Sequence, residues 1–240
     1  WDLPWQTVPA CPDQESYRQK IAELEAEMVG DEPFFSWGFH ASWHGDMSRK
    51  VLDAISTTRP MVVWHRSFHE VYLNSAMLEL LEITQEGVGA RQQIDFERGH
   101  FYEVGLGYAI QKLNRFIMSD EWILKGLDRL KQIVHLGGHT TVGDLAVGLF
   151  DYELERALSV SVLDQANVPF RVLGVPHAGS AARLKGGHKE VVAHINELQG
   201  SDTSRIRHGK HIKVFTDGAF FSELAMLQEP GYLDGHHGEW

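Results

Sequence analysis

The second half of the chain alternates between two patterns of hydrophobic residues. In three segments the apolar residues recur every three to four positions, which predicts amphipathic helices. Three short apolar runs between and after these segments are typical of buried strands. The predicted helices span 120–135, 151–166 and 188–198, and the predicted strands span 140–147, 170–175 and 212–215. Helices that alternate with short apolar strands predict an α/β fold with parallel pairing.

The first half of the chain is less regular. Residues 14–29 carry apolar side chains at helical spacing and predict a helix that ends at Gly30. Residues 31–50 are rich in aromatic residues and histidine. After them, 61–64 has the pattern of a buried strand and leads to a predicted helix near 74–81. This half shows no simple repeat.

Composition and charge argue against several classes of protein. With 240 residues, 43% of them hydrophobic, the chain is long enough to bury a sizeable core. Its 33 acidic and 22 basic residues give a net charge of −11, which opposes binding to nucleic acid or to anionic membranes. No apolar run has the length of a membrane span, and the single cysteine, Cys11, excludes an intrachain disulfide. We expect a cytoplasmic protein without nucleic-acid or membrane partners.

A single lysine, Lys213, interrupts the last apolar run. Along a strand, Lys213 and Phe215 point to one side while Ile212 and Val214 point to the other. If the first side lines a barrel, desolvation favours the neutral amine, which can take up carbon dioxide and become a carbamate. A carbamate is an anionic ligand with two oxygens, and it can bridge two divalent metals whose bound water acts as a nucleophile. The alternative is that Lys213 reaches solvent from a strand end.

Two ordered motifs give the chain a family resemblance. Lys213, Phe215, Asp217 and Gly218 resemble the Lys-x-Phe-x-Asp-Gly signature of the amidohydrolase superfamily, in the branch of N-substituted formamide deformylase-like enzymes (amidohydrolase family 3 type). Far upstream, Leu-Asp, Arg-Pro, His and Asn-Ser-Ala resemble a second block of that branch. These residues lie at 52–53, 59–60, 69 and 74–76, and further matches in the same order lie at 35–39 and 138–144. The resemblance covers residues 35 to 235.

The resemblance implies a metal-dependent hydrolase. Such an enzyme cleaves an amide or another non-peptide C–N bond of a small-molecule substrate with a metal-activated water. The implied fold class is α/β: a partial TIM-type (β/α) barrel over 120–240, which holds strands two to four of eight, and an α+β insertion over 1–119 that covers the barrel mouth. The implied cofactor is a divalent metal, zinc by expectation, with Lys213 as a carbamate ligand.

The family's ligand set is incomplete in this sequence. The His-x-His pair of the first barrel strand is absent, and the later histidines and the last aspartate have no match. We therefore expect an internal fragment of a longer enzyme, inactive by itself because these ligands are missing. The missing strands of such a fragment leave apolar sheet edges exposed, which favours a homo-oligomer.

Five further residues are candidates for contacting substrate or orienting the lysine: Asp217, His69, Asn74, Asp144 and His177. Asp144 and His177 lie at or just after predicted strand ends, where the active sites of (β/α) barrels are found. Each candidate has a structural alternative. Asp144 and Asp217 would belong to turns, His177 would be a solvated loop histidine, and His69 and Asn74 would bond neighbouring backbone at the start of a helix.

Two other functions remain open. The aromatic residues between 34 and 43, with Trp64, could form the apolar wall of a non-catalytic domain that binds a small ligand or a partner protein. Lys213 could instead form a Schiff base in an aldolase or decarboxylase. A nucleotide cofactor is not indicated, because no glycine-rich stretch has the pattern of a phosphate-binding loop.

Overall fold

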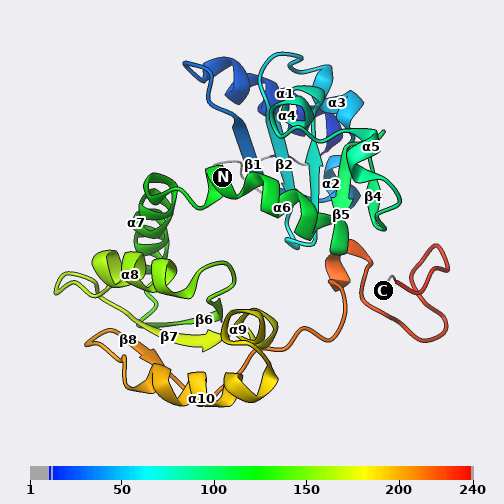
Figure 1. Ribbon diagram of the computed structural model, residues 1–240. Coiled ribbons are helices and arrows are strands. Elements are labelled where there is room, and N and C mark those ends of the chain that lie inside the picture. The colour runs from blue at the N-terminus through cyan, green and yellow to red at the C-terminus, as the bar shows by residue number, and fades with distance from the viewer. Residues whose placement is uncertain (1–10, 12, 239–240) are drawn as a thin grey trace. The chain divides into compact units, whose positions relative to one another are not determined.

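The computed structural model describes residue 11 and residues 13–238, which form two compact units (Figure 1). The first unit contains the described residues up to Leu113 together with those from Asp217 onward. The second unit contains Asn114–Thr216. The sequence instead suggests a boundary after residue 119 and assigns the residues from Asp217 to the second region.

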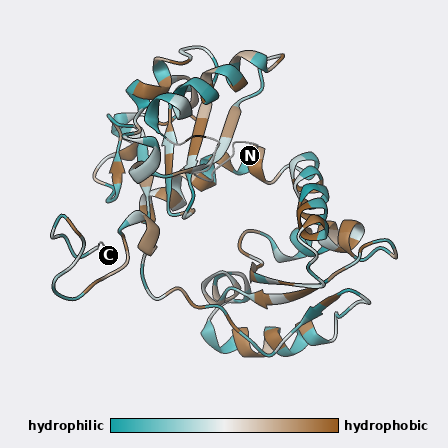
Figure 2. Cartoon of the chain, turned by 180° about the vertical axis from the view of Figure 1, so that it is seen from behind, coloured by the Kyte–Doolittle hydropathy of each residue, from teal (hydrophilic) through white to brown (hydrophobic). Residues whose placement is uncertain are grey.

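A mixed five-stranded sheet forms the centre of the first unit. Its strand order is β1-β2-β3-β5-β4, with β1 parallel to β2 and the other neighbouring pairs antiparallel. The strands are β1 (Phe34–Phe39), β2 (Met61–His65), β3 (Glu70–Leu73), β4 (Ile94–Asp95) and β5 (His100–Tyr102). Every residue of β2 and β3 is buried, so both faces of these strands are covered. Figure 2 colours much of these strands as hydrophobic.

Helix α1 packs against this sheet and confirms the helix predicted over 14–29. The helix begins after Asp13, whose carboxylate accepts a hydrogen bond from the Ser16 N–H at 2.8 Å. Its residues Tyr17 and Ile21 are buried in one cluster with residues of β1, β2 and β3. The helices from here to the second unit are α1 (Gln14–Glu27), α2 (Ala41–His44), α3 (Arg49–Asp53), α4 (Ser75–Leu80), α5 (Gln85–Val88) and α6 (Val104–Ile117), and a short 3-10 helix spans Phe220–Ser222.

The second unit is built around a three-stranded parallel sheet, as the alternating pattern predicts. The strand order is β6-β7-β8, and both neighbouring pairs are parallel. Its core joins Val134 and Leu163 from two helices with Phe170 and Ile206 at the sheet. The elements are α7 (Asp120–Leu136), β6 (Thr141–Val147), α8 (Tyr152–Leu163), β7 (Arg171–Pro176), α9 (Ala178–Lys185), α10 (His188–Gln199) and β8 (Ile206–His208).

The strand predicted over 212–215 is wrong. The third strand of this sheet is β8, and around Lys213 the pairing is reduced to a single parallel bridge with His177. The apolar side chains that suggested a buried strand are largely exposed: Ile212 is 44%, Val214 59% and Phe215 50% accessible.

The described strands form two open sheets, and no closed barrel is present among them. The fold class is therefore mixed α/β, which confirms the coarse prediction, while the partial TIM-type barrel is not shown. No helix in the described part of the chain combines the length and the apolar character needed to cross a membrane.

Candidate functional site

Lys213 is anchored at the carboxyl end of β7. The Lys213 N–H donates to the Pro176 carbonyl at 2.9 Å, and the Ala178 N–H donates to the Lys213 carbonyl at 2.8 Å. These bonds flank His177, which is the bridge partner of Lys213. The carboxyl ends of parallel strands are where α/β folds place ligands. The predicted key lysine therefore lies at the expected edge of the sheet, although not on a strand of its own.

The Lys213 side chain lies over an aromatic ring. Its Nζ is 5.0 Å from the ring centroid of Phe215, within the range of a cation–π contact. The His177 ring is on the same Phe215 side chain, with a centroid separation of 4.6 Å. Lys213 itself is partly buried. Phe215, the phenylalanine of the signature, thus brings the lysine and the histidine into one small cluster.

His177 caps helix α9, and this role fixes its tautomer. Its Nδ1 accepts a hydrogen bond from the Ser180 N–H at 3.2 Å. Desolvation lowers the pKa of His177, and the nearby Arg183 and Lys213 lower it further. The ring is therefore neutral at pH 7, with its one lone pair directed at Ser180 and its proton on Nε2. In this state His177 can donate a hydrogen bond through Nε2, but it cannot bind a metal through that atom.

Asp144 lies on β6, in register with residues of both other strands of the second sheet. Across the sheet Asp144 pairs with Gly174, and Gly174 pairs with His208. A side chain on Gly174 would meet the His208 ring at 2.9 Å, so this glycine leaves room for the imidazole. Asp144 accepts the Ala146 N–H at 3.2 Å, the turn role that the structural alternative describes. Asp144 is exposed as a residue, yet desolvation of its carboxyl group raises its pKa, with His208 opposing this shift.

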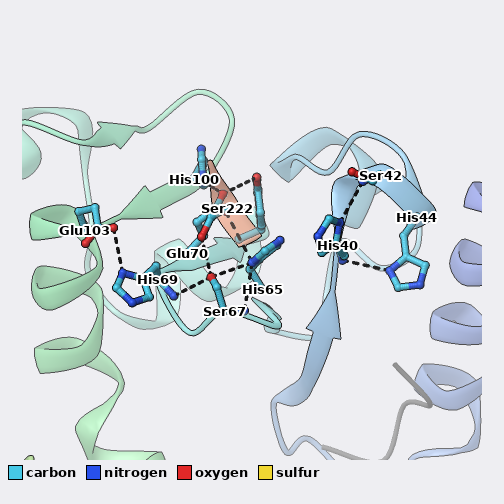
Figure 3. Close-up of polar contacts among 11 residues, drawn as sticks. His40, Ser42, His44, His65, Ser67, His69, Glu70, His100, Glu103 and Ser222 are labelled. Atoms are coloured by element: carbon cyan, nitrogen blue, oxygen red, sulfur yellow. Dashed lines mark hydrogen bonds and ion pairs between the residues drawn. The ribbon is translucent and has the colours of Figure 1, made fainter. Parts of the chain in front are cut away.

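His69 pairs with Glu103 in the first unit (Figure 3). The His69 Nδ1 and the Glu103 Oε1 are 2.9 Å apart, and the Glu103 N–H donates to the His69 carbonyl at 3.1 Å. Both side chains are partly exposed, 23% for His69 and 21% for Glu103. Sequence reasoning missed Glu103, which is 34 residues away from His69.

Asn74 is a structural residue in this fold. Its side chain is fully buried, and its Oδ1 accepts the N–H groups of Met61 at 2.8 Å and Met77 at 2.9 Å. Its Nδ2 donates to the carbonyls of Ser56 and Arg59, both at 2.9 Å. Four bonds to backbone use the full capacity of the amide. Asn74 thus caps α4 and joins it to β2, as its structural alternative describes.

Asp217 and Gly218 fold back onto the first unit. Asp217 accepts the Met226 N–H through Oδ2 at 3.2 Å, which stabilises the turn that follows. A Cβ on Gly218 would lie 2.6 Å from the Leu224 carbonyl oxygen and 2.7 Å from the Glu103 Oε1. The glycine of the downstream motif therefore packs directly against the partner of His69 from the upstream motif.

A buried polar network surrounds Glu70 of β3. Glu70 Oε2 is 2.8 Å from His100 Nε2 and accepts the Tyr72 hydroxyl at 3.3 Å. Burial raises the pKa of Glu70, but these hydrogen bonds and the neighbouring imidazoles outweigh it, so the pKa is lowered overall. Burial lowers the pKa of His65, which is 3.7 Å from Glu70, to about 4. Because His65 is neutral at pH 7, His100 and Tyr72 are the groups that hold the Glu70 carboxylate.

Among the described residues, one group of three side chains has the spacing of a metal site: Glu223, Asp234 and His236. Both ring nitrogens of His236 face acceptors, namely the Asp234 carboxylate and the Glu223 carbonyl. These acceptors raise the pKa of His236, and they occupy both ring nitrogens, through which a metal would have to bind. The group therefore fits an exposed ion pair better than a metal centre.

Comparison with known proteins identifies solved structures with a similar fold but no protein family. No protein-family model matches the sequence, and no curated protein matches it. Two crystal structures of uncharacterized metal-dependent hydrolases share the fold. The one from Pyrococcus horikoshii OT3 is 20% identical over 96% of this chain with a TM-score of 0.58, and the one from Pyrococcus furiosus is 19% identical over 97% with a TM-score of 0.55. This chain spans 43% and 44% of their lengths. It therefore has a fold found in metal-dependent hydrolases.

Proposed function

We propose that this chain is part of a metal-dependent hydrolase that cleaves an amide or another non-peptide C–N bond, with Lys213 as a carbamate ligand of a divalent metal. The observation that carries the proposal is the anchoring of Lys213 beside His177 at the carboxyl end of β7. Its support is twofold. The fold likeness is to two metal-dependent hydrolases, and the residues around Lys213 follow the amidohydrolase signature.

The described residues near Lys213 do not complete a metal centre. His177 directs its lone pair at Ser180, and the three-residue group at Glu223 does not include the lysine. The proposal therefore requires ligands in addition to Lys213. When bound, a divalent metal such as zinc supplies a water acidic enough to attack a carbonyl carbon near neutral pH. In this proposal the residues of this chain hold Lys213 in place, and His177 donates a hydrogen bond beside it through Nε2–H.

Metal content tests the proposal. Elemental analysis is carried out on this chain and on the longest natural chain that contains it, each with Lys213 intact and with Lys213→Ala. The matched control is Lys210→Ala, which removes an exposed lysine three positions away. We expect metal in the longer chain, its loss in Lys213→Ala, and its retention in Lys210→Ala. Metal that survives Lys213→Ala, or the absence of metal from every version, contradicts the proposal.

A further inference from the structure

Two side-chain hydrogen-bond donors lie close to one glycine of α9. A Cβ atom on Gly179 would lie 3.7 Å from Nε2 of His177 and 3.9 Å from Nη1 of Arg183. Because glycine has no side chain, a small group can approach this point from outside and meet both donors. We call this position the Gly179 notch. Its three residues, His177, Gly179 and Arg183, all belong to the second unit.

Ser180 holds both donors of the Gly179 notch in place. Its N–H donates to Nδ1 of His177 at 3.2 Å, and its Oγ accepts a hydrogen bond from Nη2 of Arg183 at 3.0 Å. Ser180 is buried, and its Oγ also donates to the Leu149 carbonyl at 3.1 Å. A buried residue therefore fixes the imidazole and the guanidinium before any ligand arrives, which lowers the cost of binding a ligand between them.

Each of the two side chains keeps a donor for a ligand. Because Nδ1 of His177 accepts the Ser180 N–H, the ring proton is on Nε2. Among the residues that the structure describes, nothing hydrogen-bonds to Nε2 of His177 or to Nη1 of Arg183, and no ion pair includes Arg183. His177 is half-buried and Arg183 is exposed, so solvent and small molecules reach both.

The charge around the notch is positive, although the chain as a whole is acidic. Helix α9 carries Arg183 and Lys185 and has no acidic residue. The bond to Ser180 directs Arg183 toward the amino terminus of α9, as is usual for long side chains on helices, and away from the carbonyls of the last turn. Lys213, whose backbone bonds flank His177, adds a further basic group. The ligand that these groups favour is an anion.

We propose that the Gly179 notch binds a carboxylate, with one oxygen accepting from Nε2–H of His177 and the other from Nη1 of Arg183. Arginine forms charge-assisted hydrogen bonds with carboxylates. Two donors of which one is charged match a group that has two oxygens and one negative charge. The notch follows the carboxyl end of β7, where parallel sheets bind ligands. On the proposed function, on which this step rests, the substrate is an amide that also carries a carboxylate.

Binding of N-acetylglycine tests the notch on this chain. N-acetylglycine is an amide with a carboxylate, and N-acetylglycinamide is the same amide without the charge. The backbone amide signals of Gly179 and Ser180, followed by nitrogen–proton NMR, should shift with the first compound and not with the second. Arg183→Gln removes the charged donor, and Gly179→Ala fills the notch with a methyl group while favouring the helix. Each variant should weaken the binding of N-acetylglycine by about tenfold or more.

The matched control is Lys185→Gln, which removes the same charge from an exposed position of α9. Binding of N-acetylglycine in this variant should stay within about twofold of the wild type, because an exposed charge outside the notch is screened. An unshifted wild type, equal losses in Lys185→Gln and Arg183→Gln, or equal shifts with the charged and the neutral amide overturn the carboxylate site. Displacement of N-acetylglycine by a lower concentration of inorganic phosphate assigns the notch to phosphate and also overturns it.

The substrate class is tested on the longest natural chain, loaded with zinc. Arg183→Gln should lower kcat/KM for a carboxylate-bearing amide about tenfold more than kcat/KM for the matching neutral amide, whereas Lys185→Gln should lower neither. An equal effect of Arg183→Gln on both substrates overturns the substrate class. The two proposals fail separately: failure of the Lys213 metal test leaves the binding of N-acetylglycine standing, and a chain that does not bind N-acetylglycine leaves the metal result standing.

Discussion

Lys213 and His177 form a single parallel bridge beyond the end of the β7–β8 ladder. The ladder ends where Gly174 pairs with His208. From that pair there are three steps from Gly174 to His177, just past the end of β7, but five steps from His208 to Lys213. Two extra residues therefore loop out before the pairing resumes. The position of Lys213 thus depends on the end of β7 and the start of α9, and not on a continuous strand around the lysine.

Replacement of Asn74 should destabilise the first unit. Asn74→Ala leaves the buried Met61 N–H and the carbonyls of Ser56 and Arg59 without their partner. We expect a loss of about 2 to 4 kcal/mol in the free energy of unfolding, because a cap and several buried polar groups are affected together. Urea denaturation measures the change. The control is Glu79→Ala, at an exposed position of the same helix, and an equal loss in the two variants would contradict the assignment.

Mildly acidic pH should destabilise the protein. Burial lowers the pKa of His44 and of His65 to about 4, whereas an unfolded chain binds the proton near pH 6.5. Between these values the unfolded state binds more protons, so stability falls as the pH falls, by up to about 1.4 kcal/mol per pH unit for each histidine. The lowered pKa of Glu70 acts in the same direction: its stabilisation is present above its ordinary value of 4.5 and is lost below it.

Urea denaturation between about pH 7.5 and pH 4.5 measures this slope. His44→Gln should flatten it, while His135→Gln, at an exposed position, should not. A free energy of unfolding that stays constant over this interval would show that the buried histidines are not held in the neutral form.

An alanine at Gly218 should loosen the segment that follows it. The new Cβ would meet the backbone carbonyl of Leu224, which cannot move as cheaply as a side chain, and the Glu103 carboxylate. We expect faster limited proteolysis within 217–238 and a changed NMR signal of the His69 ring. Gly107→Ala is the control, because nothing lies within 4 Å of its Cβ position on α6. Alanine there should be neutral or stabilise by about 1 kcal/mol through helix propensity. Equal proteolysis of the two variants would contradict the close packing at Gly218.

The sequence predicts the second unit well up to β7 and fails at its last strand. The three predicted helices and the first two predicted strands carry clear apolar patterns, and their bounds agree within a few residues, but the sequence analysis missed α9. The third strand, β8, contains an arginine and a histidine and has no visible apolar pattern. The third strand was therefore predicted at the apolar run 212–215 instead. Nothing in that run shows that its side chains are exposed, because exposure depends on which segments lie beside it.

The candidate site was predictable only in part. The motifs identify Lys213, His69 and Asp217. The structure places Lys213 with His177 in one unit, and it places Gly218 against Glu103, the partner of His69, in the other. Glu103 could not be found from spacing, because its contact with His69 requires the register of β3 and β5 and a left-handed backbone. Asn74 reads equally well as a cap or as a substrate contact until its four backbone bonds are known.

Carbon-13 NMR detects the carbamate that we propose on Lys213. The longest natural chain is loaded with zinc in carbon-13 bicarbonate, and the same is done with Lys213→Ala and with Lys210→Ala. We expect one carbamate resonance in the wild type and in Lys210→Ala, and none in Lys213→Ala. A metal-loaded wild type without a carbamate resonance, or a resonance that persists in Lys213→Ala, would contradict this proposal.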